Sequence, residues 1–144
     1  MFTGAETENM ELAIACYNSA LKVRTRECFS SDWATTQNNL GNAYIDRIAG
    51  EREDNLEVAI DCFTNSLKIY TQEDYPLNWA ITLNNLGAAY YERMKGGRKQ
   101  NLTQAISYFQ ATLKQYTCQE FPMERAKTQD NLAQANQQLA SVGG

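Results

Sequence analysis

A repeat of 46 residues constrains this chain more than any other feature. The tetrapeptide Asn-Asn-Leu-Gly stands at 38–41 and again at 84–87, and the segments 9–54 and 55–100 are identical at 21 of 46 positions without a gap. A weaker third copy follows to the end of the chain. One short repeat cannot bury its apolar face alone, whereas stacked copies bury a continuous core. We therefore expect one domain over 1–144, with repeat units at about 9–54, 55–100 and 101–144.

Each copy contains two apolar patterns with steps of three and four, the spacing of one helix face. The first, which we call the B pattern, is Leu56, Ile60, Phe63, Leu67 and Tyr70. The second, the A pattern, is Trp79, Leu83, Leu86, Tyr90 and Met94. No strand pattern accompanies them. The spacing predicts an all-α chain of about six helices, at roughly 8–28, 32–48, 54–72, 77–95, 100–118 and 123–140.

Polar and flexible residues mark the expected helix ends. An asparagine precedes each B pattern, where an N-cap side chain satisfies the first free amides of a helix; these are Asn9, Asn55 and Asn101. Gly50 and Gly96 follow the A patterns, where glycine readily takes the left-handed C′ conformation. The short linkers predict antiparallel neighbouring helices.

Composition and charge exclude several classes of protein. Apolar residues make up 43% and charged residues 21%, as in globular proteins. The net charge is −4 and the basic residues form no cluster, so we expect no nucleic-acid partner. No apolar run approaches the roughly 20 residues that a membrane helix needs. The sequence begins with no signal-peptide pattern, and we expect a cytoplasmic protein.

The residues that most often perform catalysis or bind metal are scarce. The chain has no histidine, and its four cysteines form no C-x-x-C pair, so we expect neither a metal site nor a cofactor. Without histidine the usual general base is missing, and we expect no enzymatic activity. Cys16 and Cys62 occupy equivalent repeat positions and are expected to be small, reduced residues of the core or its edge.

The repeat resembles the tetratricopeptide repeat. The matching residues are Leu40-Gly41, Tyr44, Ala59, Phe63, Ser66 and Pro76, and in the next copy Leu86-Gly87, Tyr90, Ala105, Phe109, Thr112 and Pro122. The common repeat has about 34 residues; this longer one is similar to the long-helix repeats of kinesin light chain and of large bacterial signalling proteins. The resemblance covers almost all of the chain after about residue 8 and implies a right-handed α-solenoid of antiparallel helix pairs.

The resemblance also implies a protein–protein interaction module that binds a partner peptide or protein on the concave face, which the A helices line. The polar positions on those helices are Asn38, Asn39, Asn42, Asp46, Asn84, Asn85, Tyr91, Glu92, Lys127, Asn131 and Gln134. An asparagine amide both donates and accepts, so it suits the backbone of an extended peptide. For the Asn39, Asn85 and Asn131 series, an alternative is a hydrogen bond to a neighbouring helix that holds the repeats together.

The two ends of the chain differ in character. Arg125, Gln129 and Asn136 replace apolar residues of the A pattern, so 123–140 is predicted to be a polar C-terminal cap. At the N-terminus the B pattern persists and predicts an oligomer interface, giving a homodimer, at Met10, Ile14, Tyr17 and Leu21. Alternatives are that residues 1–8 cover this face or that the chain is a fragment of a longer array. Self-assembly is thus a second hypothesis for function.

Overall fold

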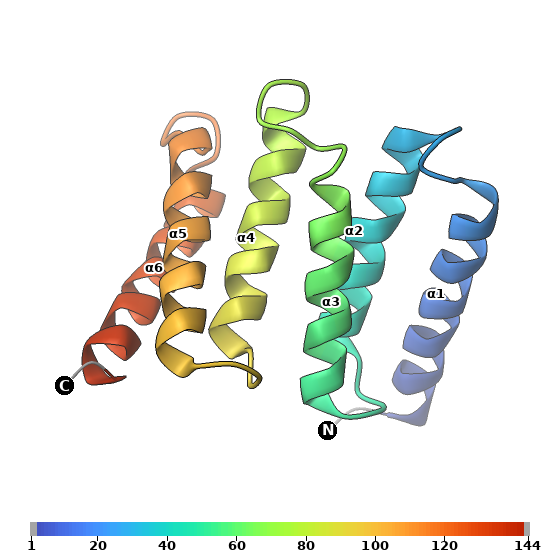
Figure 1. Ribbon diagram of the computed structural model, residues 1–144, viewed down its shortest axis with the longest axis horizontal. Coiled ribbons are helices and arrows are strands. Elements are labelled where there is room, and N and C mark those ends of the chain that lie inside the picture. The colour runs from blue at the N-terminus through green and yellow to red at the C-terminus, as the bar shows by residue number, and fades with distance from the viewer. Residues whose placement is uncertain (1–2, 143–144) are drawn as a thin grey trace. The chain divides into compact units, whose positions relative to one another are not determined.

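The computed structural model describes residues 3–142, and within them the chain forms six α-helices and no strand (Figure 1). This confirms the predicted all-α class. None of the helices in this range is long and apolar enough to cross a membrane. The chain divides between Tyr70 and Thr71 into two compact units, each of three helices. The helices are α1 (Gly4–Val23), α2 (Ser30–Asp46), α3 (Arg52–Ser66), α4 (Pro76–Glu92), α5 (Arg98–Gln115) and α6 (Pro122–Val142).

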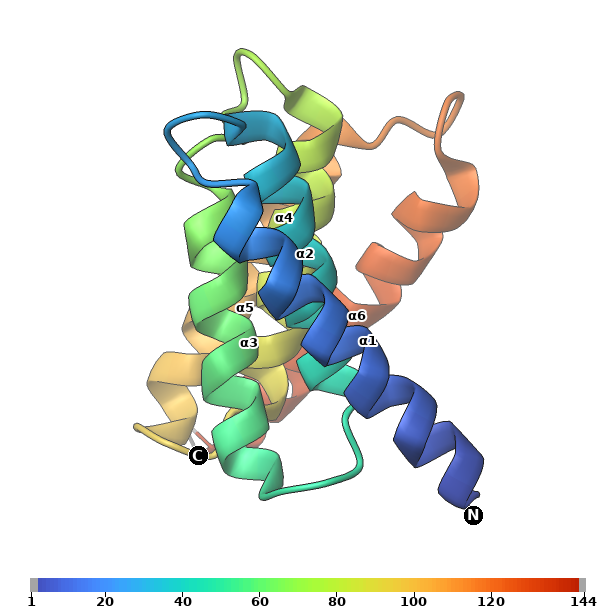
Figure 2. The ribbon, with the colours of Figure 1, turned by 90° about the vertical axis from the view of Figure 1, so that its right-hand side faces the viewer.

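Helix α1 begins four residues earlier than expected, because a capping box holds its first turn. The Thr3 side chain accepts a hydrogen bond from the Glu6 amide at 3.2 Å, and the Glu6 carboxylate accepts one from the Thr3 amide at 2.6 Å. These two bonds satisfy amides that a helix N-terminus otherwise leaves without a partner. In Figure 2 the N-terminal turns of α1 project clear of α2 and α3.

The expected N-cap role of the three asparagines is wrong. Asn55 and Asn101 lie inside α3 and α5, whose N-cap residues are Glu51 and Gly97, and Asn9 lies inside α1. The two buried asparagines instead hold the loop that precedes their helix. The Asn55 amide donates to the Ala49 carbonyl at 2.9 Å, and the Asn101 amide donates to the Lys95 carbonyl at 2.9 Å.

The expected role of Gly50 and Gly96 at the helix ends is also wrong. Helices α2 and α4 already end at Asp46 and Glu92, and the glycines lie later in the loops, just before α3 and α5. Their φ angles are 78° and 82°, a region that glycine enters without the steric cost of a side chain. The glycines thus shape the loops that the buried asparagines hold.

In the N-terminal unit, α2 lies against both α1 and α3 (Figure 1). The fully buried side chains of α3 include Leu56 and Phe63, and the Phe63 ring packs directly against the backbone of α2 at Gly41. The Ser66 hydroxyl of α3 donates to the Ala34 carbonyl of α2 at 2.6 Å. Ile14 of α1 is buried with Leu40 of α2 and Cys62 of α3.

The C-terminal unit repeats this packing with α4 and α5. Phe109 packs against the backbone at Gly87, and the Thr112 hydroxyl lies 3.3 Å from the Ala80 carbonyl of α4 and 2.9 Å from the Tyr108 carbonyl of α5. Helix α6 packs mainly against α5, also contacts α4, and completes a core around Phe109 and Ala135. The hydrophobic contacts of each unit therefore follow the positions that the repeat makes equivalent.

The polar residues predicted for the C-terminal cap take two different positions. Gln129 and Asn136 are exposed on α6, as a polar outer face requires. Arg125 is half-buried and donates from Nη1 to the carbonyls of Leu113 and Tyr116, at 2.8 and 2.6 Å. Its guanidinium therefore satisfies carbonyl groups at the C-terminal end of α5, where a cation also interacts well with the helix dipole.

Candidate partner-binding site

An open groove of about 510 Å³, which we call the N-terminal groove, lies between α1 and α2. Asn39, Asn42 and Asp46, all predicted to bind a partner, line it from α2. They are exposed because α2 turns its opposite face, with Leu40, toward the core. The side of α1 contributes Glu6, Asn9, Met10, Ala13 and Tyr17, and Ala43 lies between them on α2.

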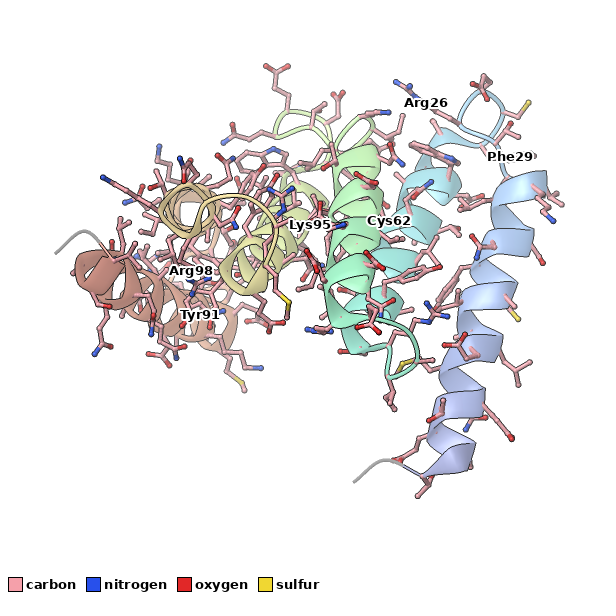
Figure 3. All side chains as sticks on the ribbon, turned by 60° about the horizontal axis from the view of Figure 1, so that its bottom comes forward. Arg26, Phe29, Cys62, Tyr91, Lys95 and Arg98 are labelled. Carbon is pink, nitrogen blue, oxygen red and sulfur yellow. The ribbon has the colours of Figure 1, made fainter. Side chains whose placement is uncertain are left out.

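A smaller and more enclosed groove of about 160 Å³, the C-terminal groove, lies in the other unit. Tyr91 and Glu92 line it from α4, and Asn131 and Gln134 line it from α6. All four were predicted to bind a partner. The ring of Phe109 on α5 and the small side chain of Ala88 complete the lining. Here the Tyr91 ring lies 5.3 Å from the Arg98 guanidinium, which also donates to the Tyr91 carbonyl (Figure 3).

The remaining predicted residues lie outside these two grooves. Asn84 is half-buried, and its side-chain oxygen accepts a hydrogen bond from the Thr128 hydroxyl of α6 at 3.1 Å. It therefore connects two helices of its unit. Asn38 and Asn85 are half-buried and each takes part in an interaction within the protein. Lys127 is exposed on α6.

The four residues predicted for an oligomer interface do not share one environment. Ile14 is only 6% exposed and belongs to the core of the N-terminal unit, Tyr17 and Leu21 pack half-buried against that core, and Met10 is half-buried. Met10 and Tyr17 also line the N-terminal groove. The most exposed large apolar side chains of α1 are instead Leu12, at 63%, and Val23, at 73%.

Arg47, the C-cap residue of α2, links the end of that helix to α1 through an ion pair with Glu11. Arg47 donates from Nε and Nη2 to the two Glu11 carboxylate oxygens at 2.8 and 3.1 Å, and from Nη1 to the Asn55 side chain at 3.1 Å. The hydrogen bond from Arg47 lowers the pKa of the Glu11 carboxyl, and the same bond raises the pKa of Arg47. Asp46 has no salt bridge to a residue within 3–142 and faces the groove.

The residues that line the groove from α1 were not predicted as site residues, apart from the two assigned to an oligomer. Glu6 precedes the first recognised repeat unit and Asn9 begins it, and the family resemblance points only to the A helices. A signal was present for Glu6, because Thr3 and Glu6 form the spacing of a capping box. That spacing places the carboxylate in the first turn of α1.

Comparisons of the chain with protein-family models, with curated proteins and with solved structures found no match.

Proposed function

We propose that this protein is a non-catalytic interaction module of the cytoplasm, built from tetratricopeptide-type repeats that continue as a right-handed solenoid, and that it binds a peptide segment of a partner protein. One observation carries the proposal. In each unit, polar residues at equivalent repeat positions line a groove beside apolar or aromatic side chains: Asn39 and Asn42 in one, Asn131 and Gln134 in the other.

The chemistry of these grooves suits a peptide. Side-chain amide groups donate and accept hydrogen bonds, so they can pair with the backbone of a bound peptide whatever the side chains of that peptide are. Tyr17 in one groove and Tyr91 in the other offer large amphipathic surfaces of the kind enriched at binding sites. The N-terminal groove opens widely to solvent, the C-terminal groove less so, and Asp46 and Glu92 each add a carboxylate to the lining.

A random peptide display library, selected against the whole chain, tests this function. The selected peptides are measured against the wild type, the double variants Asn39→Ala/Asn42→Ala and Asn131→Ala/Gln134→Ala, and Asn18→Ala as an exposed asparagine outside both grooves. We expect at least one double variant to lose about fivefold or more in affinity, since two hydrogen bonds are removed. Peptides that bind all four proteins equally would refute the proposal, as would a selection that yields none.

Self-assembly is the second candidate, and the exposure of apolar side chains on α1 favours it. Leu12 and Val23 are the most exposed of these, and exposed apolar area concentrates at interfaces. Sedimentation at low micromolar concentration distinguishes the two functions. If α1 forms a homodimer, Leu12→Glu gives a monomer, while Met123→Glu, at a similarly exposed position on α6, leaves the dimer intact. A monomeric wild-type protein excludes this candidate.

A further inference from the structure

Helix α1 has the apolar B pattern of α3 and α5. It differs from them at positions through which α3 contacts α2 and α5 contacts α4. In α3, the Arg52 guanidinium donates to the Ile45 carbonyl near the C-terminal end of α2. In α5, Arg98 makes the same contact with Tyr91 near the end of α4 (Figure 3). The repeat places Glu6 at this position in α1, which inverts the charge.

A second contact point also changes in α1. The Ser66 hydroxyl donates to the Ala34 carbonyl of α2 at 2.6 Å, and the Thr112 hydroxyl lies 3.3 Å from the Ala80 carbonyl of α4 and 2.9 Å from the Tyr108 carbonyl of its own helix. The equivalent residue of α1 is Ala20, which has no hydroxyl. A helix C-terminus carries partial negative charge, so Glu6 would repel an A helix in the orientation of α2 or α4. The N-terminal groove is therefore poorly suited to another helix of the same repeat.

The charged side chains that line the groove are both acidic. Glu6 and Asp46 are exposed on opposite walls, one from each helix. Arg47 forms its ion pair with Glu11, Arg52 donates to the Ile45 carbonyl, and neither arginine lines the groove. A ligand in the groove thus meets two carboxylates above a surface formed by Met10 and Tyr17.

We propose that the N-terminal groove binds a partner-protein segment in which lysine or arginine flanks a large apolar side chain. This inference rests on the proposed binding function and specifies the partner. The apolar side chain packs on Met10 and Tyr17, and the cation pairs with Asp46 or Glu6. The amides of Asn39 and Asn42 bind the segment's backbone. Opposite charges at the rim of an interface contribute mainly to specificity and to the association rate.

Three synthetic peptides test this charge requirement by fluorescence anisotropy. They share length and an aromatic-aliphatic centre, and their flanking residues are lysine, glutamine or glutamate. We expect the lysine peptide to bind best and to lose affinity as sodium chloride is raised, because salt screens exposed charges. Removing one groove carboxylate should lower the affinity for the lysine peptide about two- to fivefold, the effect of an exposed ion pair.

The variants are chosen to separate charge from folding. Glu6→Gln removes the charge but keeps a side chain that completes a capping box, and Asp46→Asn keeps the size of the residue. Glu73→Gln, exposed in the loop before α4, changes the net charge equally and should leave binding unchanged. Asp46→Lys should reverse the preference, so that the glutamate peptide binds better than the lysine peptide. Circular dichroism verifies that each variant keeps its helix content.

The possible results separate this inference from the function on which it rests. Equal affinity of the three peptides, with loss in Asn39→Ala/Asn42→Ala, would refute the basic partner but support peptide binding. An unchanged order of affinities in Asp46→Lys would refute the basic partner in the same way. If neither these peptides nor any from the display library bind, both proposals fail. A homodimer that Tyr17→Glu disrupts, and that excludes the lysine peptide, would make a second copy the occupant and overturn the inference.

Discussion

The ring of Phe63 fills the space that a side chain at position 41 would need. A Cβ at Gly41 would stand 2.5 Å from Cε1 of Phe63, closer than two carbon atoms approach without a clash. Gly87 and Phe109 repeat the relationship at the same distance. Both rings are almost fully buried, so neither can move aside without disturbing the core. The recurrent glycine therefore sets how closely each A helix approaches its B helix.

Replacing this glycine should destabilise the N-terminal unit. We expect Gly41→Ala to lower the free energy of unfolding by about 1–3 kcal/mol, the usual cost of overpacking a core. Urea denaturation followed by circular dichroism measures it. Gly4→Ala is the matched control, because nothing lies within 4 Å of a Cβ at that helix start, and it should change stability by less than about 0.5 kcal/mol. Equal effects of the two substitutions would contradict the packing role of Gly41.

The buried asparagines should contribute to stability through the loops they hold. Asn55 is 3% exposed, and its amide binds the Ala49 carbonyl while its oxygen accepts from Arg47. Asn55→Ala leaves those groups without a partner and should cost about 1–3 kcal/mol in unfolding free energy. Asn9→Ala, at the equivalent but exposed position of α1, should lower the unfolding free energy by only about a few tenths of a kcal/mol, as other surface substitutions do. Thermal and urea unfolding of both variants compares them directly.

The six helices were predicted well because their apolar spacing repeats. The roles predicted for several single residues at the helix ends were wrong. Asn55 precedes an apolar stripe and so resembles an N-cap, but α3 begins three residues earlier, at Arg52. The helix boundary depends on the loop geometry that Gly50 permits, which spacing alone does not specify. A shift of three residues in the helix start therefore turns an expected N-cap into a residue of the first helical turns.

The candidate site was predictable only in part, for a related reason. Positions such as Asn131 and Gln134 were found because α6 keeps the repeat's spacing and presents the same face as α2. Asn84 belongs to the same set, but its side chain reaches Thr128, a contact between residues far apart in sequence. Glu6 was missed because it differs from the arginines at its equivalent positions, and a repeat is recognised by what its copies share.

Two asparagines on A helices should therefore respond differently to substitution. Asn84→Ala removes the side-chain contact with the buried Thr128 hydroxyl, which keeps the Glu124 carbonyl as an acceptor, and should lower unfolding free energy by about 1 kcal/mol or less while leaving peptide affinity unchanged. Asn39→Ala should change affinity and leave stability within about 0.5 kcal/mol, because Asn39 is exposed. Leu86→Ala, a fully buried position, sets the upper scale at about 2–5 kcal/mol. If Asn39→Ala instead lowers stability and leaves affinity unchanged, while Asn84→Ala lowers affinity, Asn39 does not belong to the site.

The ion pair between Glu11 and Arg47 should make stability depend on pH. Because Arg47 lowers the pKa of Glu11 in the folded protein, the pair stabilises the fold above the unfolded carboxyl pKa, and this contribution is lost as pH falls through the lower folded value. Glu11→Gln should thus show a smaller fall in stability between neutral and acidic pH than the wild type. Glu8→Gln, which removes a carboxylate of α1 outside this ion pair, is the control. Identical slopes in all three proteins would contradict this role of the pair.

The four cysteines should differ in reactivity because only one is buried. Cys16, Cys28 and Cys118 are exposed, whereas Cys62 packs with Ile14 and Leu40 in the core of the N-terminal unit. Burial, with a smaller contribution from the nearby Asp61 carboxylate, raises the pKa of the Cys62 thiol to about 12, so almost no thiolate forms at neutral pH. Since the thiolate is the nucleophile, Cys62 should remain unmodified in the folded protein.

A disulfide-exchange reagent should therefore modify the three exposed cysteines rapidly and Cys62 only at the rate of unfolding. Cys62→Ala is the control that identifies the slow thiol, because it should abolish the slow phase and leave the fast phase intact. Rapid modification of all four thiols in a protein that keeps its full helix content would show that Cys62 is accessible. Such a result would contradict the packing of Cys62 with Ile14 and Leu40, and with it the arrangement of α1, α2 and α3 around a shared core.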